Sequence, residues 1–253
     1  MCYDRTMDIL TNRRSLIAHL GAVTSLLGVS GGSSAFAGSK GREVERLISR
    51  IDEVSGALRG ELISVTDWRV GIDELLSQIP PEDLMRGIDF DQLARRIGFA
   101  ELGVTTARID FGVNESRKLD FLPKLFAVDT GRSILPHGHA NMVSAHLPLS
   151  GSFRLRQYDQ LSRDEQSLTI RPTVDQTIRS GDLSSIGEDD DNVHWFIAQE
   201  PSYTFDVIVT GLDETARQPY DIFNLDMAEA ERVEGDALRV PRLTVSEALI
   251  KYG

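Results

Sequence analysis

The segment Gly131-Arg132-Ser133-Ile134-Leu135-Pro136-His137-Gly138-His139 is the most informative part of this chain of 253 residues, because it places two histidines two positions apart. On a β-strand, side chains at i and i+2 point to the same face, so the pair can present two imidazoles to one ligand. A third histidine, in Asn192-Val193-His194, could join them from a neighbouring strand and leave the opposite face of a metal open. We therefore predict that His137, His139 and His194 bind one divalent metal. The competing interpretation is that they are ordinary hydrogen-bonded histidines.

Around this segment, short runs with a period of two predict a chain built mainly of β-strands. The runs cover residues 104–111, 124–129, 142–149, 152–158, 167–173, 193–198 and 203–209, and the tail near residues 238–245 predicts one late strand. Many short strands without helices between them are typical of a sandwich or a barrel.

The segment before residue 100 has a helical period instead. We expect helices over residues 41–59, 66–79 and 89–97, the last with Asp89 as N-cap and Gly98 beyond its end. The expected organisation is a signal peptide at 1–37, a helical segment at 38–100, and a β-barrel with a C-terminal tail at 101–253. No linker separates helices from strands, which indicates one α+β unit.

The glycines around the histidine pair have the spacing of a known family. Gly131, His137, His139 and Gly151 resemble the cupin superfamily, whose barrel is a jelly roll, or double-stranded β-helix. That family usually has a glutamate four or five residues after the second histidine, where this chain has Val143-Ser144. The departure resembles the three-histidine branch, which includes the thiol dioxygenases.

Within that branch the chain is most similar to cysteamine dioxygenase and the plant cysteine oxidases. The resemblance covers roughly residues 124–210 and rests on Pro136-His137-Gly138-His139, Met142, Leu149, Gly151, Tyr158-Asp159, Asn192-Val193-His194-Trp195-Phe196 and Phe205-Asp206-Val207. It implies Fe(II), a thiol substrate, dioxygen and a sulfinate product, with Asp206 beside the metal. The tyrosine that this family keeps shortly after Asp206 is absent, because the segment reads Thr210-Gly211-Leu212-Asp213.

Two further residues are candidates for catalytic roles. His146 shares a strand face with Ser144, so it could line the cavity as a donor beside the ligands, replace the missing carboxylate, or be a structural histidine. Asp206 is a catalytic candidate or a member of a structural hydrogen-bond network. The acidic run at residues 188–191 would favour a cationic substrate if it borders the cavity, and is otherwise a solvated turn.

The first residues are typical of an export signal. Arg13-Arg14 precede a moderately apolar stretch and the small-residue site Ala35-Phe36-Ala37, which predicts the twin-arginine machinery as a partner, cleavage after Ala37 and a periplasmic or secreted protein. The apolar stretch is shorter than a membrane span requires, so we expect no stable span in the mature form. Cleavage would also remove Cys2, the only cysteine, leaving histidine and carboxylate to carry the chemistry.

A formal net charge of −12 argues against nucleic acid as a partner. Three functions remain open. The first is an exported Fe(II) dioxygenase acting on a small thiol, the second a metal-binding cupin module without oxygenase activity, and the third another cupin enzyme such as a diketone dioxygenase, lyase or isomerase. Iron is the metal that the resemblance implies, whereas Zn, Mn, Ni or Cu would also accept three histidines.

Overall fold

The computed structural model describes residues 33–111 and 118–253, with side chains from residue 41 onward. The predicted export signal falls outside the described residues up to position 32, and its last residues, 33–37, lie in the first turns of a helix. Within the described ranges, no helix is long and apolar enough to cross a membrane.

Among the described residues, four helices precede the strands. They are α2 (Ser33–Arg59), α3 (Val65–Ser77), α4 (Pro81–Gly87) and α5 (Phe90–Ile97). A capping box between Ser64 and Asp67 begins α3, because each side chain accepts a hydrogen bond from the other residue's backbone N–H. The prolines at 80 and 81 end the predicted helix as expected but also begin α4, which the sequence analysis missed. The prediction for Asp89 was wrong in part, since it stands at the N-cap in a left-handed conformation without a side-chain cap.

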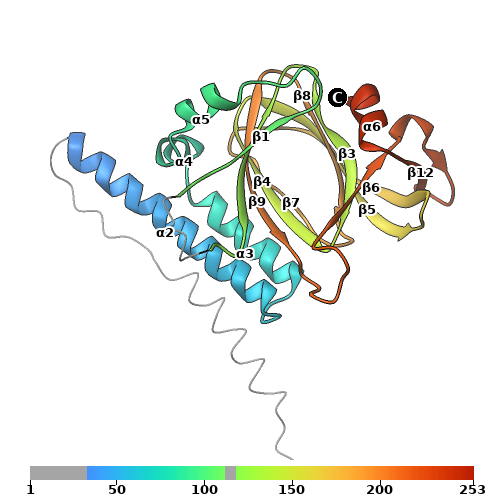
Figure 1. Ribbon diagram of the computed structural model, residues 1–253, viewed down its shortest axis with the longest axis horizontal. Helices are drawn as coiled ribbons and strands as arrows, with labels where there is room; N and C mark the ends of the chain where they lie inside the picture. Colours follow the sequence, from blue (N-terminus) through green and yellow to red (C-terminus); the bar gives the residue numbers. More distant parts are fainter. Residues whose placement is uncertain (1–32, 112–117) are drawn as a thin grey trace, which may run out of the picture.

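The strands form two antiparallel sheets that face each other as a jelly-roll barrel (Figure 1). The five-stranded sheet has the order β1-β2-β9-β4-β7, and the seven-stranded sheet has the order β10-β3-β8-β5-β6-β12-β11. Their bounds are β1 (Thr105–Arg108), β2 (Leu122–Val128), β3 (Ser133–Ala140), β4 (Met142–Ser150), β5 (Ser152–Arg163), β6 (Ser167–Arg179), β7 (Ser184–Ile186), β8 (Val193–Ala198), β9 (Ser202–Thr210), β10 (Asp221–Leu225), β11 (Glu231–Arg232) and β12 (Leu238–Leu243). A 3-10 turn (η1, Met227–Glu229) and helix α6 (Val245–Tyr252) complete the chain.

The predicted mainly β fold with an N-terminal helical segment is confirmed. Every predicted strand is present, and the predicted late strand is β12. The sequence analysis did not predict β3, β7, β10, β11 or α6. For β3 the reason is physical, since Pro136 and Gly138 are poor strand residues and the segment lacks a polar–apolar alternation.

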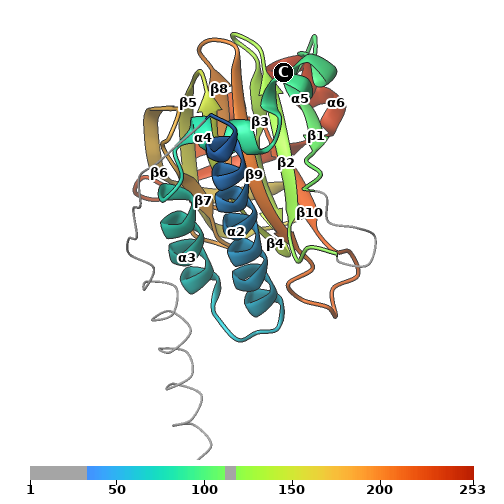
Figure 2. The same ribbon diagram turned by 90° about the vertical axis from the view of Figure 1, so that its left-hand side faces the viewer.

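The helices cover the outer face of the five-stranded sheet, as the two views show (Figure 1, Figure 2). Trp68 of α3 is fully buried in the same core as Phe205 and Val207 of β9. Because side chains alternate along a strand, the intervening Asp206 points into the barrel. The same alternation on β8 places His194 inside and Trp195 outside, where its ring packs on Tyr252 of α6. The five-stranded sheet is therefore buried on both faces, with helices α2–α4 on one side and the cavity on the other.

Candidate metal centre

The structure brings the three predicted ligands together. His137 and His139 lie on β3, and His137 stands directly opposite His194 of the adjacent strand β8. The ring centroids are 4.6 Å apart for His137–His139, 4.4 Å for His137–His194 and 4.9 Å for His139–His194. One nitrogen of each ring lies within 4.8 Å of the others, so the group could hold a metal ion.

A register irregularity next to the first histidine fixes its ring. The pairing of β3 with β8 shifts between Ile134 and His137, where Pro136 has no N–H to donate. The Leu135 carbonyl lies 2.6 Å from His137 Nδ1. Since a carbonyl can only accept, Nδ1 carries the proton and the lone pair is on Nε2. The bulge therefore sets the tautomer that a metal requires.

Asn192 holds the second histidine by its backbone. Its Oδ1 accepts from the His139 N–H at 2.8 Å, and its Nδ2 donates to the His139 carbonyl at 3.2 Å. This close approach explains the glycine between the two histidines, because a Cβ on Gly138 would lie 2.9 Å from Asn192 Oδ1. Asn192 lies two residues before His194, so one side chain ties together the two strands that carry the ligands.

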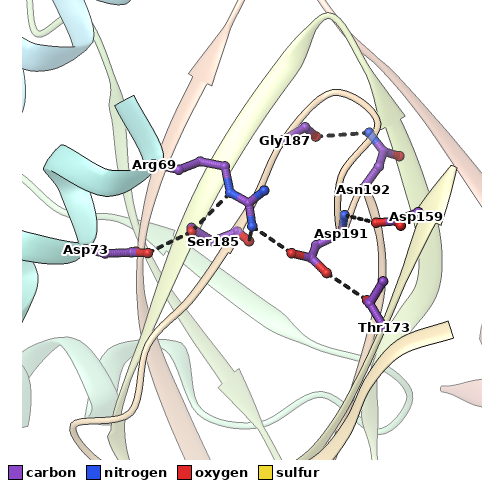
Figure 3. Close-up of polar contacts among 8 residues, drawn as sticks. All are labelled: Arg69, Asp73, Asp159, Thr173, Ser185, Gly187, Asp191 and Asn192. Atoms are coloured by element: carbon purple, nitrogen blue, oxygen red, sulfur yellow. Dashed lines mark hydrogen bonds and ion pairs between the residues drawn. The ribbon is translucent and has the colours of Figure 1, made fainter. Parts of the chain in front are cut away.

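The loop before Asn192 is in turn tied to the helical layer (Figure 3). Arg69 of α3 pairs with Asp191 at 2.7 Å and donates to the Ser185 carbonyl at 2.8 Å. The other Asp191 oxygen accepts from the Thr173 hydroxyl at 2.7 Å, and the Asp191 N–H donates to Asp159. The acidic run at 188–191 is not among the described lining residues of the cavity, so the condition under which it would favour cationic substrates is not met.

The histidines have the protonation state of metal ligands. Burial lowers the pKa of His137 to about 4, and burial together with the neighbouring imidazoles holds the pKa values of His139 and His194 well below the ordinary value. All three rings are therefore neutral at pH 7. His139 Nδ1 and His194 Nδ1 are buried without a hydrogen-bond partner among the described residues. Three neutral rings facing one another, two with unsatisfied nitrogens, fit a metal ion better than a hydrogen-bond network.

His146 and Asp206 form a buried pair next to the three ligands. His146 Nδ1 lies 2.8 Å from Asp206 Oδ2, and His146 Nε2 lies 3.0 Å from Ser144 Oγ. The other Asp206 oxygen accepts from the Thr204 hydroxyl at 2.6 Å. The His146 ring is 5.1 Å from that of His194, between centroids. Both ring nitrogens of His146 are engaged, so it contacts the ligand group without belonging to it.

A cavity of about 200 Å³ opens beside the histidines. Its walls are mainly apolar and include Phe126 and Ile208. The polar lining residues that the sequence analysis missed include Lys124 of β2 and Tyr220, which precedes β10. Alternation alone does not identify Lys124, because its place opposite Asp206 depends on the pairing of β2 with β9. Nothing in the sequence pattern indicates that Tyr220 returns to the cavity.

The strand order and the three-histidine group together define a jelly-roll barrel with a candidate metal site. No model of a known protein family matches the chain, and no curated protein matches it. Solved structures similar to it include an 11S globulin from Wrightia tinctoria (19% identity, 44% of this chain and 26% of that chain, TM-score 0.34). KdgF from a Halomonas species is 16% identical over 42% of this chain and 77% of its own, with a TM-score of 0.31.

A cupin superfamily protein from Desulfitobacterium hafniense is 14% identical over 46% of this chain and 85% of its own, with a TM-score of 0.30. The match to the 11S globulin spans only 26% of that protein's length. At these TM-scores the similarities carry no argument about the site. The fold assignment rests on the strand order of the chain itself.

Proposed function

We propose that this protein is an Fe(II)-dependent cupin that oxidises a small thiol to a sulfinate. The observation that supports this most is a group of three neutral histidines without a carboxylate among them, next to a small, mainly apolar cavity. Three neutral ligands leave the full charge of a divalent ion available to an anionic thiolate. The resemblance around His137, His139 and His194 favours a thiol over other substrates of such sites.

The reaction is balanced without a further reductant. The O–O bond of dioxygen breaks, two S–O bonds form, and the sulfur supplies the four electrons. Bound Fe(II) would supply the Lewis acidity that deprotonates the thiol and the redox capacity for dioxygen. The mainly apolar cavity would exclude water around the reacting sulfur.

His146 and Asp206 are proposed to hold and move the proton. Asp206 fixes the His146 ring through Nδ1, which leaves Nε2 facing the Ser144 hydroxyl inside the cavity. A thiol proton could reach His146 Nε2 through that hydroxyl, while the carboxylate stabilises the resulting imidazolium. Thr204 holds the carboxylate in place from the other side.

The test measures iron binding first and oxygen consumption second. Protein reconstituted anaerobically with iron should bind one equivalent, and His194→Ala should lose it while keeping the far-UV circular dichroism spectrum. Supplied with a small thiol, the wild type should consume oxygen and give a product heavier by two oxygen atoms. Full iron occupancy without oxygen uptake above free iron, across a panel of thiols, would reject the proposal in favour of a metal-binding module or another cupin activity.

A second variant separates the proton-handling pair from the ligands. Asp206→Asn keeps the size of the side chain but removes the charge facing His146, so we expect turnover to fall at least tenfold with iron binding changed far less. Asp175→Asn is the matched control, because Asp175 pairs with Arg154 away from the cavity. Equal turnover in both variants would contradict the role of Asp206.

A further inference from the structure

We propose that Lys124 forms an anion subsite in the cavity, so that the substrate is a small thiol carrying a carboxylate. This inference rests on the proposed function, because it names the class of thiol that the site accepts. It departs from the sequence analysis, which associated an acidic run with cationic substrates.

Lys124 reaches the cavity from the wall opposite the ligand strands. It lies on β2 of the five-stranded sheet, whereas His137 and His194 lie on the seven-stranded sheet, and all three line the same cavity. Within its own sheet it stands directly opposite Asp206, which in turn stands opposite His146 on β4. A ligand held at the histidines and extending across the barrel therefore meets the row that contains Lys124.

The ammonium of Lys124 has no anionic partner among the described residues. In the ranges 33–111 and 118–253, no carboxylate pairs with it, and its Nζ lies 5.9 Å from the centroid of the Phe126 ring. Asp206 is its cross-strand neighbour, yet both carboxylate oxygens of Asp206 already accept from Thr204 and His146. A half-buried cation among apolar walls without a partner is costly, and an incoming anion would compensate it.

The other charges that line the cavity also favour an anionic ligand. Lys124 is the only lysine or arginine in the described lining, and Asp206 is the only carboxylate there. With a divalent ion at the histidines, the interior is positive at both ends, which suits a ligand with a thiolate at one end and a carboxylate at the other. A cavity of about 200 Å³ suits a small acid.

The experiment compares three thiols that share a two-carbon spacer and differ only in their end group. They are 3-mercaptopropionate, 2-mercaptoethanol and cysteamine, which are anionic, neutral and cationic. Binding is measured by calorimetry on protein loaded with Zn(II) under anaerobic conditions, so no oxygen chemistry is needed. We expect the carboxylate to bind at least tenfold more tightly than the alcohol, as a charge-assisted hydrogen bond provides, and cysteamine to bind most weakly.

Variants assign this preference to Lys124. Lys124→Met should reduce the ratio of carboxylate to alcohol affinity to about one, Lys124→Arg should keep it, and Lys118→Met, which alters an exposed lysine outside the cavity, should leave it unchanged. Should Lys124→Met fail to fold, Lys124→Gln serves with the same measurement. A wild type that does not prefer the carboxylate, or a Lys124 variant that keeps the preference, would overturn the subsite.

The two proposals fail separately. A Lys124-dependent preference without oxygen uptake by the iron form would reject the thiol dioxygenase and keep the anion subsite. Oxygen uptake with all three thiols and no dependence on Lys124 would reject the subsite and keep the dioxygenase.

Discussion

Replacing Asn192 by alanine should weaken metal binding through the backbone of a ligand, without touching any imidazole. The side chain is fully buried, and the change leaves the His139 N–H and carbonyl without partners, together with the carbonyls of Gly187 and Glu188 that its Nδ2 also contacts. Each buried backbone group left unsatisfied costs about 1–3 kcal/mol, and water entering the vacated space recovers part of it. We therefore expect a loss of about 2–4 kcal/mol in the free energy of unfolding of the metal-free protein.

The effect on the metal is expected to be separate from this loss. A partner that orients a ligand without binding the metal is typically worth about 10–100-fold in metal affinity. Competition with a chelator, well below the unfolding temperature, measures that affinity, and urea unfolding measures stability. Asp164→Ala is the control, since it also removes several loop hydrogen bonds, to Gln166 and Ser167, but lies outside the metal cavity. If the metal affinity of Asn192→Ala were within twofold of that of the wild type, the hydrogen bonds from Asn192 to the His139 backbone would have no role in the site.

Three other perturbations give independent tests. Gly138→Ala should reduce metal affinity and stability together, because the new methyl group would lie 2.9 Å from Asn192 Oδ1 and displace the Asn192 side chain. A variant with wild-type thermal stability would contradict this contact. Acidification should destabilise the metal-free protein, because the pKa of His137 falls from 6.5 to about 4 on folding, so the unfolded chain binds the proton first. That group contributes roughly 3 kcal/mol, present above pH 6.5 and lost as the pH falls towards 4. Urea unfolding at several pH values measures it, and a stability independent of pH in this window would refute buried neutral rings. Changing Arg13 and Arg14 to lysine should retain the protein in the cytoplasm, as fractionation of cells would show, and unchanged export would exclude the twin-arginine route.

The sequence was sufficient to predict the strands whose two faces differ and the grouping of the three histidines. Alternation predicted β9, because Phe205 and Val207 enclose the polar Asp206, and the i, i+2 spacing placed His137 and His139 on one face. The strand that carries this pair was nevertheless not predicted as a strand, since Pro136 and Gly138 break the pattern for reasons that are specific to the site. Local rules fail here because tertiary contacts with β8 and Asn192 decide the conformation.

The remaining lining of the cavity depends on contacts between distant parts of the chain. Tyr220 reaches the cavity from a segment beyond β9, and its position depends on loop contacts that no periodicity encodes. Asn141 supplies some of these contacts, with its side chain bonded to the backbone of Asp213 and Gln218. By contrast, the final helix could have been predicted from the capping box of Thr244 and Glu247.

Because the five-stranded sheet is buried on both faces, neighbouring positions along β9 have different roles, one in packing and the next in lining the cavity. Val207 and Val209 pack against the helical layer, whereas Ile208 and Thr210 face the cavity. Substitutions at the second pair can alter ligand preference while the packing of the first pair is untouched. A library restricted to cavity-facing positions should therefore yield mostly folded variants with new specificities, and randomising the alternate positions should yield mostly unfolded ones. This arrangement makes the barrel a scaffold whose chemistry can diversify without rebuilding its core.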